Sequence, residues 1–534
     1  MSVIEKNQKE NENNFKSYSI NRNNSNITKN KSNIIIFIYC LIISSICLLF
    51  CSKSSPLYAL NDWCDANTYF TIGKSMFYGL VPYKDLFEQK GPLLYFVHEI
   101  AYMLSHSSFL GVYIIEVVSF SIFLYFMNKI IGIFCSKKNS IWGISMLSFT
   151  ILSSFVFASG DSAEEFCITF LSISFYYFLK YFKNIYPKKM TTRELIINGI
   201  MCGCVLWIKY TMLGFWIAFI LFIVIARLMK KDYKEAVKSC LYFMLGIIIA
   251  SIPWLIYFGA NNALGDLFYT YFYVNMTAYS SNISIIKRII LALKSALAYS
   301  RHLPIFLVTA AFGYIFFMIN KKMITNKIGK IAINFAIILS SIGIYYGNNY
   351  KYYFLFLMPF MIFGICSIGY ILDKVIEKKT NKNPKLKLLY LALNILVTCG
   401  FIALTYINTP NRTNMNIDSS NLVQFKFAKF INEEQDKSIL NYNFIDGGFY
   451  TVTNTIPNIK YFSMPNIEYN SYPIIKDEQD RYIREKVTNF VICKIEENNE
   501  INIKFLNENY IEVTRDKVED DGVIYEYVLL KKCN

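Results

Sequence analysis

The feature that most constrains this chain is a series of apolar stretches, each about 20 residues long, separated by short polar connectors. A helix of about 20 apolar residues is long enough to cross the roughly 30 Å hydrocarbon core of a bilayer. Hydrophobic residues make up 54% of the 534 positions, more than the roughly 45–50% that is usual in soluble domains. The chain is therefore predicted to be a multi-pass protein of the cell membrane.

The apolar pattern predicts an all-α polytopic membrane domain with about 11 transmembrane helices. The pair 195–209 and 211–228 comes from one long apolar stretch, which is too long for one helix and carries Lys209 in its middle. We divide that stretch at Lys209, and a re-entrant hairpin is the alternative. The candidate spans are 33–52, 109–133, 141–159, 165–183, 195–209, 211–228, 238–258, 302–319, 331–347, 353–372 and 388–407.

The charges are unevenly distributed along the chain. Residues 1–408 carry 39 Lys and Arg against 18 Asp and Glu, whereas residues 409–534 carry 15 against 20. Most cations of the first part lie in the tail 1–32 and in alternate connectors, which is the positive-inside pattern. It predicts a cytoplasmic N-terminus and, with eleven spans, an extracytoplasmic C-terminal part. The net charge of +16 thus reflects topology. Membrane lipid is an expected partner, and no nucleic-acid partner is predicted.

Three domains are predicted. Residues 1–32 form a polar, Asn-rich and disordered cytoplasmic tail. Residues 33–408 form the transmembrane domain, in which 53–108 is the first outer loop with one or two interfacial helices. Residues 409–534 mix alternating runs such as NFVICKI with the helical pattern KDEQDRYIREKV, so a small extracytoplasmic α/β domain is predicted there. In that domain the Gly pair at 447–448 predicts a turn leading into a strand, FYTVTN.

The first outer loop carries charged residues at the predicted edge of the bilayer. Asp65 begins a helical pattern and could simply cap that helix, a role for which Asp62 is equally suited. Lys90 precedes Gly91-Pro92, so it must occupy a bend, with its ammonium group able to reach an anion. A carboxylate and an ammonium in one aromatic loop suit a lipid phosphate ester, because the base activates a hydroxyl and the cation neutralises the departing phosphate.

An ordered set of residues in this loop resembles the first outer loop of the GT-C glycosyltransferases. The resemblance is greatest to the branch of protein O-mannosyltransferases, aminoarabinose transferases and related family-39-type enzymes. In motif it covers mostly residues 60–100. The residues that carry it are Asp65, Tyr69, Gly79, Pro82, Tyr83, Asp85, Lys90, Gly91, Pro92, Tyr95 and Phe96.

The resemblance implies an integral-membrane glycosyltransferase that takes a sugar from a polyprenyl-phosphate donor on the outer face and inverts its configuration. Asp65 matches the acidic residue proposed as general base, and Lys90 matches the lysine that meets the donor phosphate. Tyr83 and Asp85, within the motif, are expected at the substrate. The acceptor stays open between a glycan, a lipid and a protein of the cell envelope.

A second acid is expected in this family at the outer end of the third span. Here the chain reads SGDSAEEF, and Glu165 or Glu164 is favoured over Asp161, which could cap the following helix. Lys209 is either a snorkelling side chain or a contact to the lipid phosphate. Lys351 stands where related sequences often have His or Arg, and it is a weaker candidate for contact with the donor.

Metal dependence and function retain alternatives. The three His residues do not pair at ligand spacing, but some relatives bind a divalent cation through carboxylates, and Asp65 with Glu165 could do so. A transporter or flippase for lipid-linked sugars would usually place its charged residues near the bilayer midplane and show two repeated halves. In this sequence the acids and Lys90 are predicted at the outer rim, and no internal repeat is visible. A polysaccharide polymerase or ligase would instead concentrate Arg and His in late loops.

Overall fold

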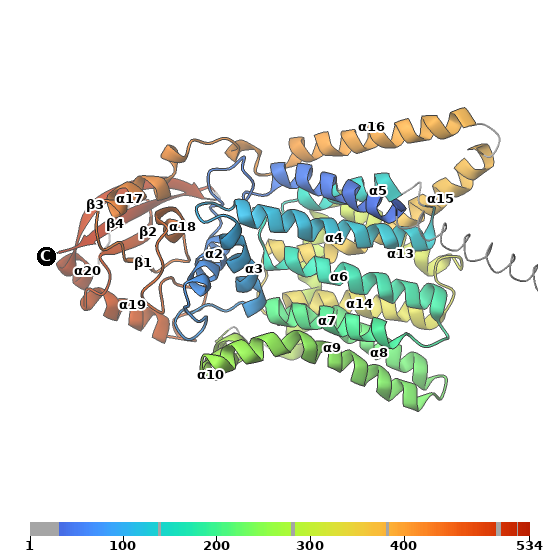
Figure 1. The fold of residues 1–534 in the computed structure, drawn as a ribbon, viewed down its shortest axis with the longest axis horizontal. Helices are drawn as coiled ribbons and strands as arrows, with labels where there is room; N and C mark the ends of the chain where they lie inside the picture. The colour runs from blue at the N-terminus through green and yellow to red at the C-terminus, as the bar shows by residue number, and fades with distance from the viewer. Residues whose placement is uncertain are drawn as a thin grey trace, which may run out of the picture.

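The computed structural model describes residues 31–136, 140–278, 284–380, 384–497, 503–520 and 522–533. A bundle of long helices forms most of the molecule, and two short helices separate one end of the bundle from a small domain with a β-sheet (Figure 1). Except for its last two residues, the predicted tail 1–32 lies outside the described part of the chain.

The long helices of the bundle run roughly along one axis (Figure 1). Six described helical stretches are long and apolar enough to cross a membrane, or seven if the pair α12–α13, which is bent by 113°, forms one span. The predicted count of eleven is therefore not confirmed, although the multi-pass architecture is. The bundle comprises Lys31–Cys51, α4 (Leu110–Phe134), α5 (Ser140–Leu152), α6 (Ala163–Lys180), α7 (Thr192–Lys209), α8 (Gly214–Leu228), α9 (Tyr233–Ala260), α13 (Pro304–Ile319), α14 (Lys327–Tyr345), α15 (Ile362–Thr380) and α16 (Pro384–Asn408).

The long apolar stretch 192–228 reverses direction after Lys209. Helix α7 ends there, one turn of 3₁₀ helix (η3, Tyr210–Leu213) follows, and α8 begins at Gly214. The backbone of α7 at Gly199 meets α9 at Phe243, and at Gly203 it meets Ile247, so α7 and α9 run parallel. A short turn connects α8 to α9, and the two helices pack side by side, with the rings of Phe219 and Phe243 6.1 Å apart. Helix α8 therefore runs antiparallel to α7 and α9. The break thus lies at the predicted residue.

Shorter elements connect these helices on the side of the sheet domain. After α9 the chain forms α10 (Leu264–Leu267), η4 (Phe268–Val274), α11 (Asn275–Ala278) and α12 (Ile285–Arg301), and η5 (Lys351–Met361) precedes α15. On the opposite side of the bundle, η2 (Tyr181–Ile185) extends α6. In α12 the apolar side chains of Ile285, Ile286 and Ile290 are exposed, as expected of an amphipathic helix at a lipid surface.

The segment 53–108, predicted as the first outer loop, contains two helices, α2 (Cys64–Phe77) and α3 (Pro92–Leu104), within the predicted number of one or two. They pack closely because α2 has a glycine at the contact: a Cβ added at Gly73 would come within 2.6 Å of the backbone at His98 and Glu99. Between them the chain turns at Gly79 and Tyr83, which both have positive φ, at 89° and 69°. The loop 78–91 is thereby directed back toward the start of α2.

The C-terminal domain is built on a four-stranded sheet in the order β1-β2-β4-β3. β1 and β2 are parallel, and the other neighbouring pairs are antiparallel. The alternating runs predicted as strands correspond to β1, β2 and β4, while β3 was not predicted. The elements are α17 (Val423–Asn432), β1 (Ile439–Tyr442), α18 (Phe449–Thr453), α19 (Ile474–Arg484), β2 (Phe490–Glu496), α20 (Lys504–Asn509), β3 (Tyr510–Asp520) and β4 (Val523–Lys532).

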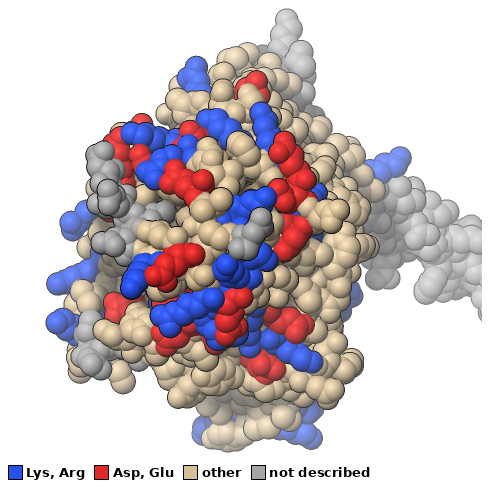
Figure 2. Space-filling view, turned by 90° about the vertical axis from the view of Figure 1, so that its left-hand side faces the viewer, with Lys and Arg blue, Asp and Glu red and all other residues tan. Residues whose placement is uncertain are grey.

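The prediction of a strand at FYTVTN was wrong, because this segment forms the short helix α18. Gly448 and Asn454 adopt left-handed conformations at its two ends, and this limits the helix to five residues. Phe449 and Tyr450 are fully buried and hold the helix against the sheet domain and α2. The face of the C-terminal domain that points away from the helix bundle mixes Lys and Arg with Asp and Glu and shows no extended patch of one sign (Figure 2).

Candidate active site

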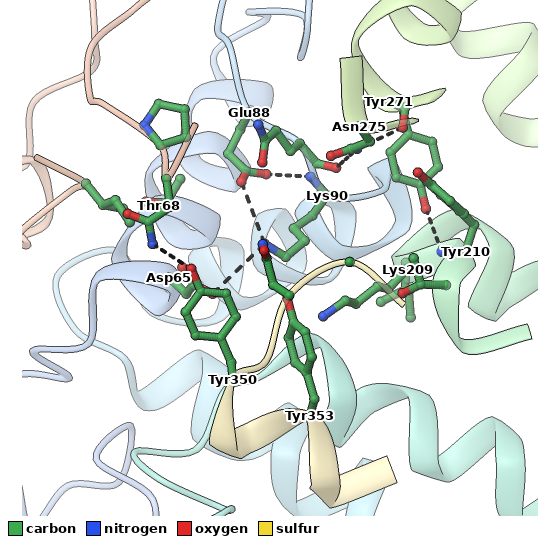
Figure 3. Close-up of a pocket in the computed structure, with 18 of the residues that line it drawn as sticks. Asp65, Thr68, Glu88, Lys90, Lys209, Tyr210, Tyr271, Asn275, Tyr350 and Tyr353 are labelled. Carbon is green, nitrogen blue, oxygen red and sulfur yellow. Dashed lines mark hydrogen bonds and ion pairs between the residues drawn. The ribbon is translucent and has the colours of Figure 1, made fainter. Parts of the chain in front are cut away.

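A cavity of about 140 Å³ lies where the helix bundle, the segment of α2 and the loop 78–91, and the C-terminal domain meet (Figure 3). Its lining comes from four regions that are distant in sequence: α2 with the loop 87–90, residues 208–211, residues 344–353, and residues 445–466 of the C-terminal domain. Tyr271 and Asn275 complete one side. The charged side chains that line it, within the described part of the chain, are Asp65, Glu88, Lys90 and Lys209.

Asp65 lies in the first turn of α2, but it does not cap the helix. The capping position is Trp63, which has no side-chain capping bond, and Asp62 forms an ion pair with Lys53 instead. The Asp65 carboxylate accepts hydrogen bonds from Tyr69 Oη at 3.1 Å and from Tyr352 Oη at 3.3 Å. Since its side chain is 16% exposed and lines the cavity, it is available to a bound substrate.

Lys90 is held beside Asp65 by the Gly-Pro sequence that follows it. Lys90 Nζ lies 4.0 Å from Asp65 Oδ2 and 3.9 Å from Glu88 Oε1. Gly91 donates its backbone N–H to Ile208 O, and a Cβ at this position would come within 2.0 Å of Trp207 O. Only glycine allows this approach of the loop to α7, and Pro92 then begins α3.

The second cation of the cavity, Lys209, comes from the end of α7. Lys209 Nζ lies 2.5 Å from Glu164 Oε1 and 3.5 Å from the centre of the Tyr353 ring. Glu164 is buried behind it in the first turn of α6. The side chains of Lys90 and Lys209 both point into the cavity (Figure 3), so two ammonium groups and the Asp65 carboxylate face the same space.

The other predicted acids of this region form a buried network outside the cavity lining. Asp161 N–H donates to both Glu116 and Glu165, and Asp161 Oδ1 lies 2.9 Å from His98 Nε2. Burial raises the pKa of Asp161 above its ordinary value, and the adjacent His98 opposes that rise. The helix α6 is capped by Ser162, which accepts from Glu165 N–H, so the capping role suggested for Asp161 was wrong.

Three predicted substrate contacts do not line the cavity. Asp85 Oδ2 accepts from the Val81 N–H and stabilises the turn before Lys90. Tyr83 is fully buried, and its hydroxyl donates to Lys90 O, so it stabilises the backbone of the loop at Lys90. Lys351 is exposed at the start of η5, next to the lining residue Tyr350.

Several residues that line the cavity are not among the site residues predicted from the sequence. Glu88 accepts from Lys90 N–H and from Tyr95 Oη, so it organises the loop as well as lining the cavity. Tyr350, Tyr352 and Tyr353, around the start of η5, line the cavity, whereas the prediction there named only Lys351. Nothing in the sequence of the C-terminal domain predicts a site, yet Ile445, Ser463, Pro465 and Asn466 form part of the cavity wall. Their only sequence signal was the Pro-Asn pair at 465–466, which is typical of a turn.

The described residues do not fit the suggested metal site. No group of three His, Cys, Asp or Glu side chains is arranged to hold a metal ion in the parts of the chain that the structure describes. Asp65 faces Lys90 in the cavity, whereas Glu165 is directed to the Asp161 backbone, so the two carboxylates do not share a site.

The apolar helices and their arrangement are those of a multi-pass membrane protein with the GT-C fold. A crystal structure of ArnT from Cupriavidus metallidurans bound to undecaprenyl phosphate is similar over 93% of this chain and 97% of that one, with a TM-score of 0.57 and 10% identity. The apo structure of ArnT from the same organism gives a TM-score of 0.55 at 10% identity, over 94% of this chain and 98% of that one. The resemblance to the GT-C superfamily is thereby confirmed at the level of the fold.

Residues 23–408 match the family described as the competence-induced protein Ccs4 N-terminal domain. The chain belongs to this family. No curated protein sequence matches it.

Proposed function

We propose that this protein is a glycosyltransferase that moves a sugar from a polyprenyl-phosphate donor to an acceptor on the outer face of the membrane. The single observation that carries the proposal is the pairing of Asp65 with Lys90, 4.0 Å apart, in a cavity at the end of the helix bundle. A general base beside a cation is the minimum needed to activate a hydroxyl and to stabilise a departing phosphate.

The proposed reaction is a single displacement at the anomeric carbon. Asp65 accepts the proton of the acceptor hydroxyl, whose oxygen forms the new bond to the sugar. The bond between the anomeric carbon and the phosphate oxygen breaks, and its electron pair leaves with the polyprenyl phosphate. Lys90 and Lys209 stabilise that dianion. Attack from the face opposite the leaving group inverts the anomeric configuration.

The hydrogen-bond partners of Asp65 suit the role of a positioned base. Tyr69 and Tyr352 donate to the same carboxylate oxygen, Oδ2, which leaves Oδ1 for the acceptor. The Tyr69 ring also lies 5.5 Å from Lys90 Nζ and packs on His98. This buried support limits the motion of Asp65 relative to Lys90, and such preorganisation favours catalysis.

Two further observations support the donor class and the outer location. A protein with the same fold, ArnT, has been crystallised with undecaprenyl phosphate. The Lys and Arg residues of the membrane domain are concentrated in the tail and in alternate connectors, which predicts that the opposite ends of the helices, where the cavity lies, face outward. The proposed acceptor is a glycan, lipid or protein of the cell envelope.

The transporter and polymerase alternatives are less well supported. A transporter site is expected near the bilayer midplane, whereas this cavity borders the C-terminal domain at one end of the bundle (Figure 3). A polymerase or ligase built on late Arg- and His-rich loops is not favoured, because the charged lining of the described cavity contains neither residue.

The test is the Asp65→Asn variant, which keeps the size of the side chain but cannot accept the proton as a carboxylate does. Transfer from a labelled polyprenyl-phosphate sugar should fall by about 10²–10⁴-fold, the usual contribution of a general base. The thermal midpoint in detergent serves as the folding control, with Asp62→Asn as the matched variant outside the cavity lining. Turnover of Asp65→Asn near the wild-type rate would remove Asp65 as the base.

A further inference from the structure

The C-terminal domain supplies one wall of the cavity and is firmly attached to the membrane domain. Phe87 N–H donates to Lys460 O at 2.9 Å, and the Phe87 ring stacks on Tyr472 with ring centres 5.6 Å apart. On the other side, Thr71 of α2 donates to the buried Asp446 at 2.6 Å. The segment 460–466 between these contacts is therefore held in place over the cavity.

This wall is uncharged, in contrast to the opposite side of the cavity. The charged lining residues described above, Asp65, Glu88, Lys90 and Lys209, all belong to the membrane domain. The facing wall consists of the polar Ser463 and Asn466 and the apolar Ile445 and Pro465 of the C-terminal domain. Asn348 and the aromatic Tyr350, from the segment of the membrane domain before η5, add further neutral groups to the lining.

Asn466 and Tyr350 join the two domains across the mouth of the cavity. Asn466 Nδ2 donates to Tyr350 Oη at 3.3 Å, and the Tyr350 ring stacks on Tyr352 with ring centres 5.6 Å apart and an interplanar angle of 17°. Tyr352 in turn donates to Asp65. The neutral wall is thus connected through two tyrosines to the proposed base.

Because the charged and the neutral lining residues occupy different walls of the cavity, we infer that Ser463, Asn466 and Tyr350 form a subsite that selects an uncharged sugar ring. The inference rests on the proposed function. Hydroxyl groups of a hexose match amide and hydroxyl side chains, and a tyrosine face covers the apolar C–H side of a sugar ring. This wall itself offers no counter-ion to the carboxylate of a charged sugar such as a uronate, and desolvating a charge against neutral groups is unfavourable. The ring that fills the subsite belongs either to the donor or to the acceptor.

The experiment measures binding to the full-length protein in detergent, in the Asp65→Asn background, in which turnover is expected to be about 10²–10⁴-fold slower. The probes are polyprenyl monophosphate, polyprenyl-phosphate hexose, polyprenyl-phosphate hexuronate and a free methyl hexoside. The variants are Asn466→Ala and, as matched control, Asn470→Ala, whose side chain is exposed outside the cavity lining. Loss of one good hydrogen bond corresponds to about a tenfold change in affinity.

If the donor sugar fills the subsite, Asn466→Ala should weaken the hexose lipid about tenfold and leave the bare lipid phosphate unchanged. If the acceptor fills it, only the affinity for the methyl hexoside should fall. Unchanged affinity of Asn466→Ala for both the hexose lipid and the methyl hexoside would overturn the inference. If Asn466→Ala does weaken the hexose lipid, equal binding of hexose and hexuronate lipids to the Asp65→Asn parent protein would also overturn it. Failure of the parent protein to bind the bare lipid phosphate would instead count against the proposed function, and the methyl hexoside would still test the subsite.

Discussion

The approach of the Lys90 loop to α7 depends on the absence of a side chain at Gly91. An ideal Cβ at this position lies 2.0 Å from Trp207 O and 2.3 Å from Trp207 C, whereas ordinary contacts begin near 3.4 Å. In Gly91→Ala the loop or the end of α7 must therefore move by about 1.4 Å. Because Lys90 and Lys209 lie on these two segments, the movement separates the cations from each other and from Asp65.

A misplacement of about 1 Å near the reacting groups can reduce a rate by about 10²-fold. We therefore expect Gly91→Ala to lower transfer from a polyprenyl-phosphate sugar by about 10²-fold. Overpacking of this kind also costs typically about 1–3 kcal/mol of stability, which is measured as a lower thermal midpoint in detergent.

The matched control is Gly132→Ala on the exposed surface of α4, where an added Cβ meets no atom within 4 Å. This variant should keep the wild-type rate and have a midpoint at or above that of the wild type, because alanine favours a helix more than glycine does. If Gly91→Ala behaves like Gly132→Ala in both assays, the loop is not held against α7 as described, and the role assigned to the Lys-Gly-Pro sequence is refuted.

Three further predictions concern buried or cavity-lining charges. Lys90→Ala should lower kcat/KM for the donor by about 10²-fold, whereas Lys84→Ala, which removes an exposed lysine of the same loop, should not; equal kinetics of the two variants would contradict the phosphate role. Glu164→Gln should destabilise the protein by about 3–5 kcal/mol, because Lys209 then loses its buried anionic partner, and an unchanged unfolding midpoint would argue against that pair. Burial lowers the pKa of Lys74 in α2 to about 7, so between pH 7 and 10 the unfolded state binds more protons and stability should rise by about 1.4 kcal/mol per pH unit. Lys74→Met should lack that rise, and parallel pH profiles of the two proteins would contradict it.

Much of the architecture could be predicted from the sequence because it depends on local composition. Apolar length determines which segments can cross a bilayer, and a lysine inside a long apolar run marks where α7 ends. Gly and Pro restrict the backbone locally, so the turn at Gly79 and the bend at Lys90 could be predicted from residue type alone. The pairing of Asp65 with Lys90 followed from the resemblance to a family motif.

The remaining features depend on contacts between residues that are distant in the sequence. Strand β3 has mixed charges and no clear alternation, and it is a strand because it pairs with β4. Glu164 faces Lys209 while its neighbour Glu165 faces Asp161, because successive residues of a helix point in different directions and only the packing of α6 determines which one meets the site.

Sequence alone determined that this is a membrane protein with a charged loop at one end of its helices, since hydropathy and backbone restrictions act over a few residues. Only the tertiary structure decided which of those charges face one cavity and that the C-terminal domain forms its uncharged wall. The physical reason is that a cavity is defined by side chains from segments hundreds of residues apart, and their separation in space is set by packing of the whole chain.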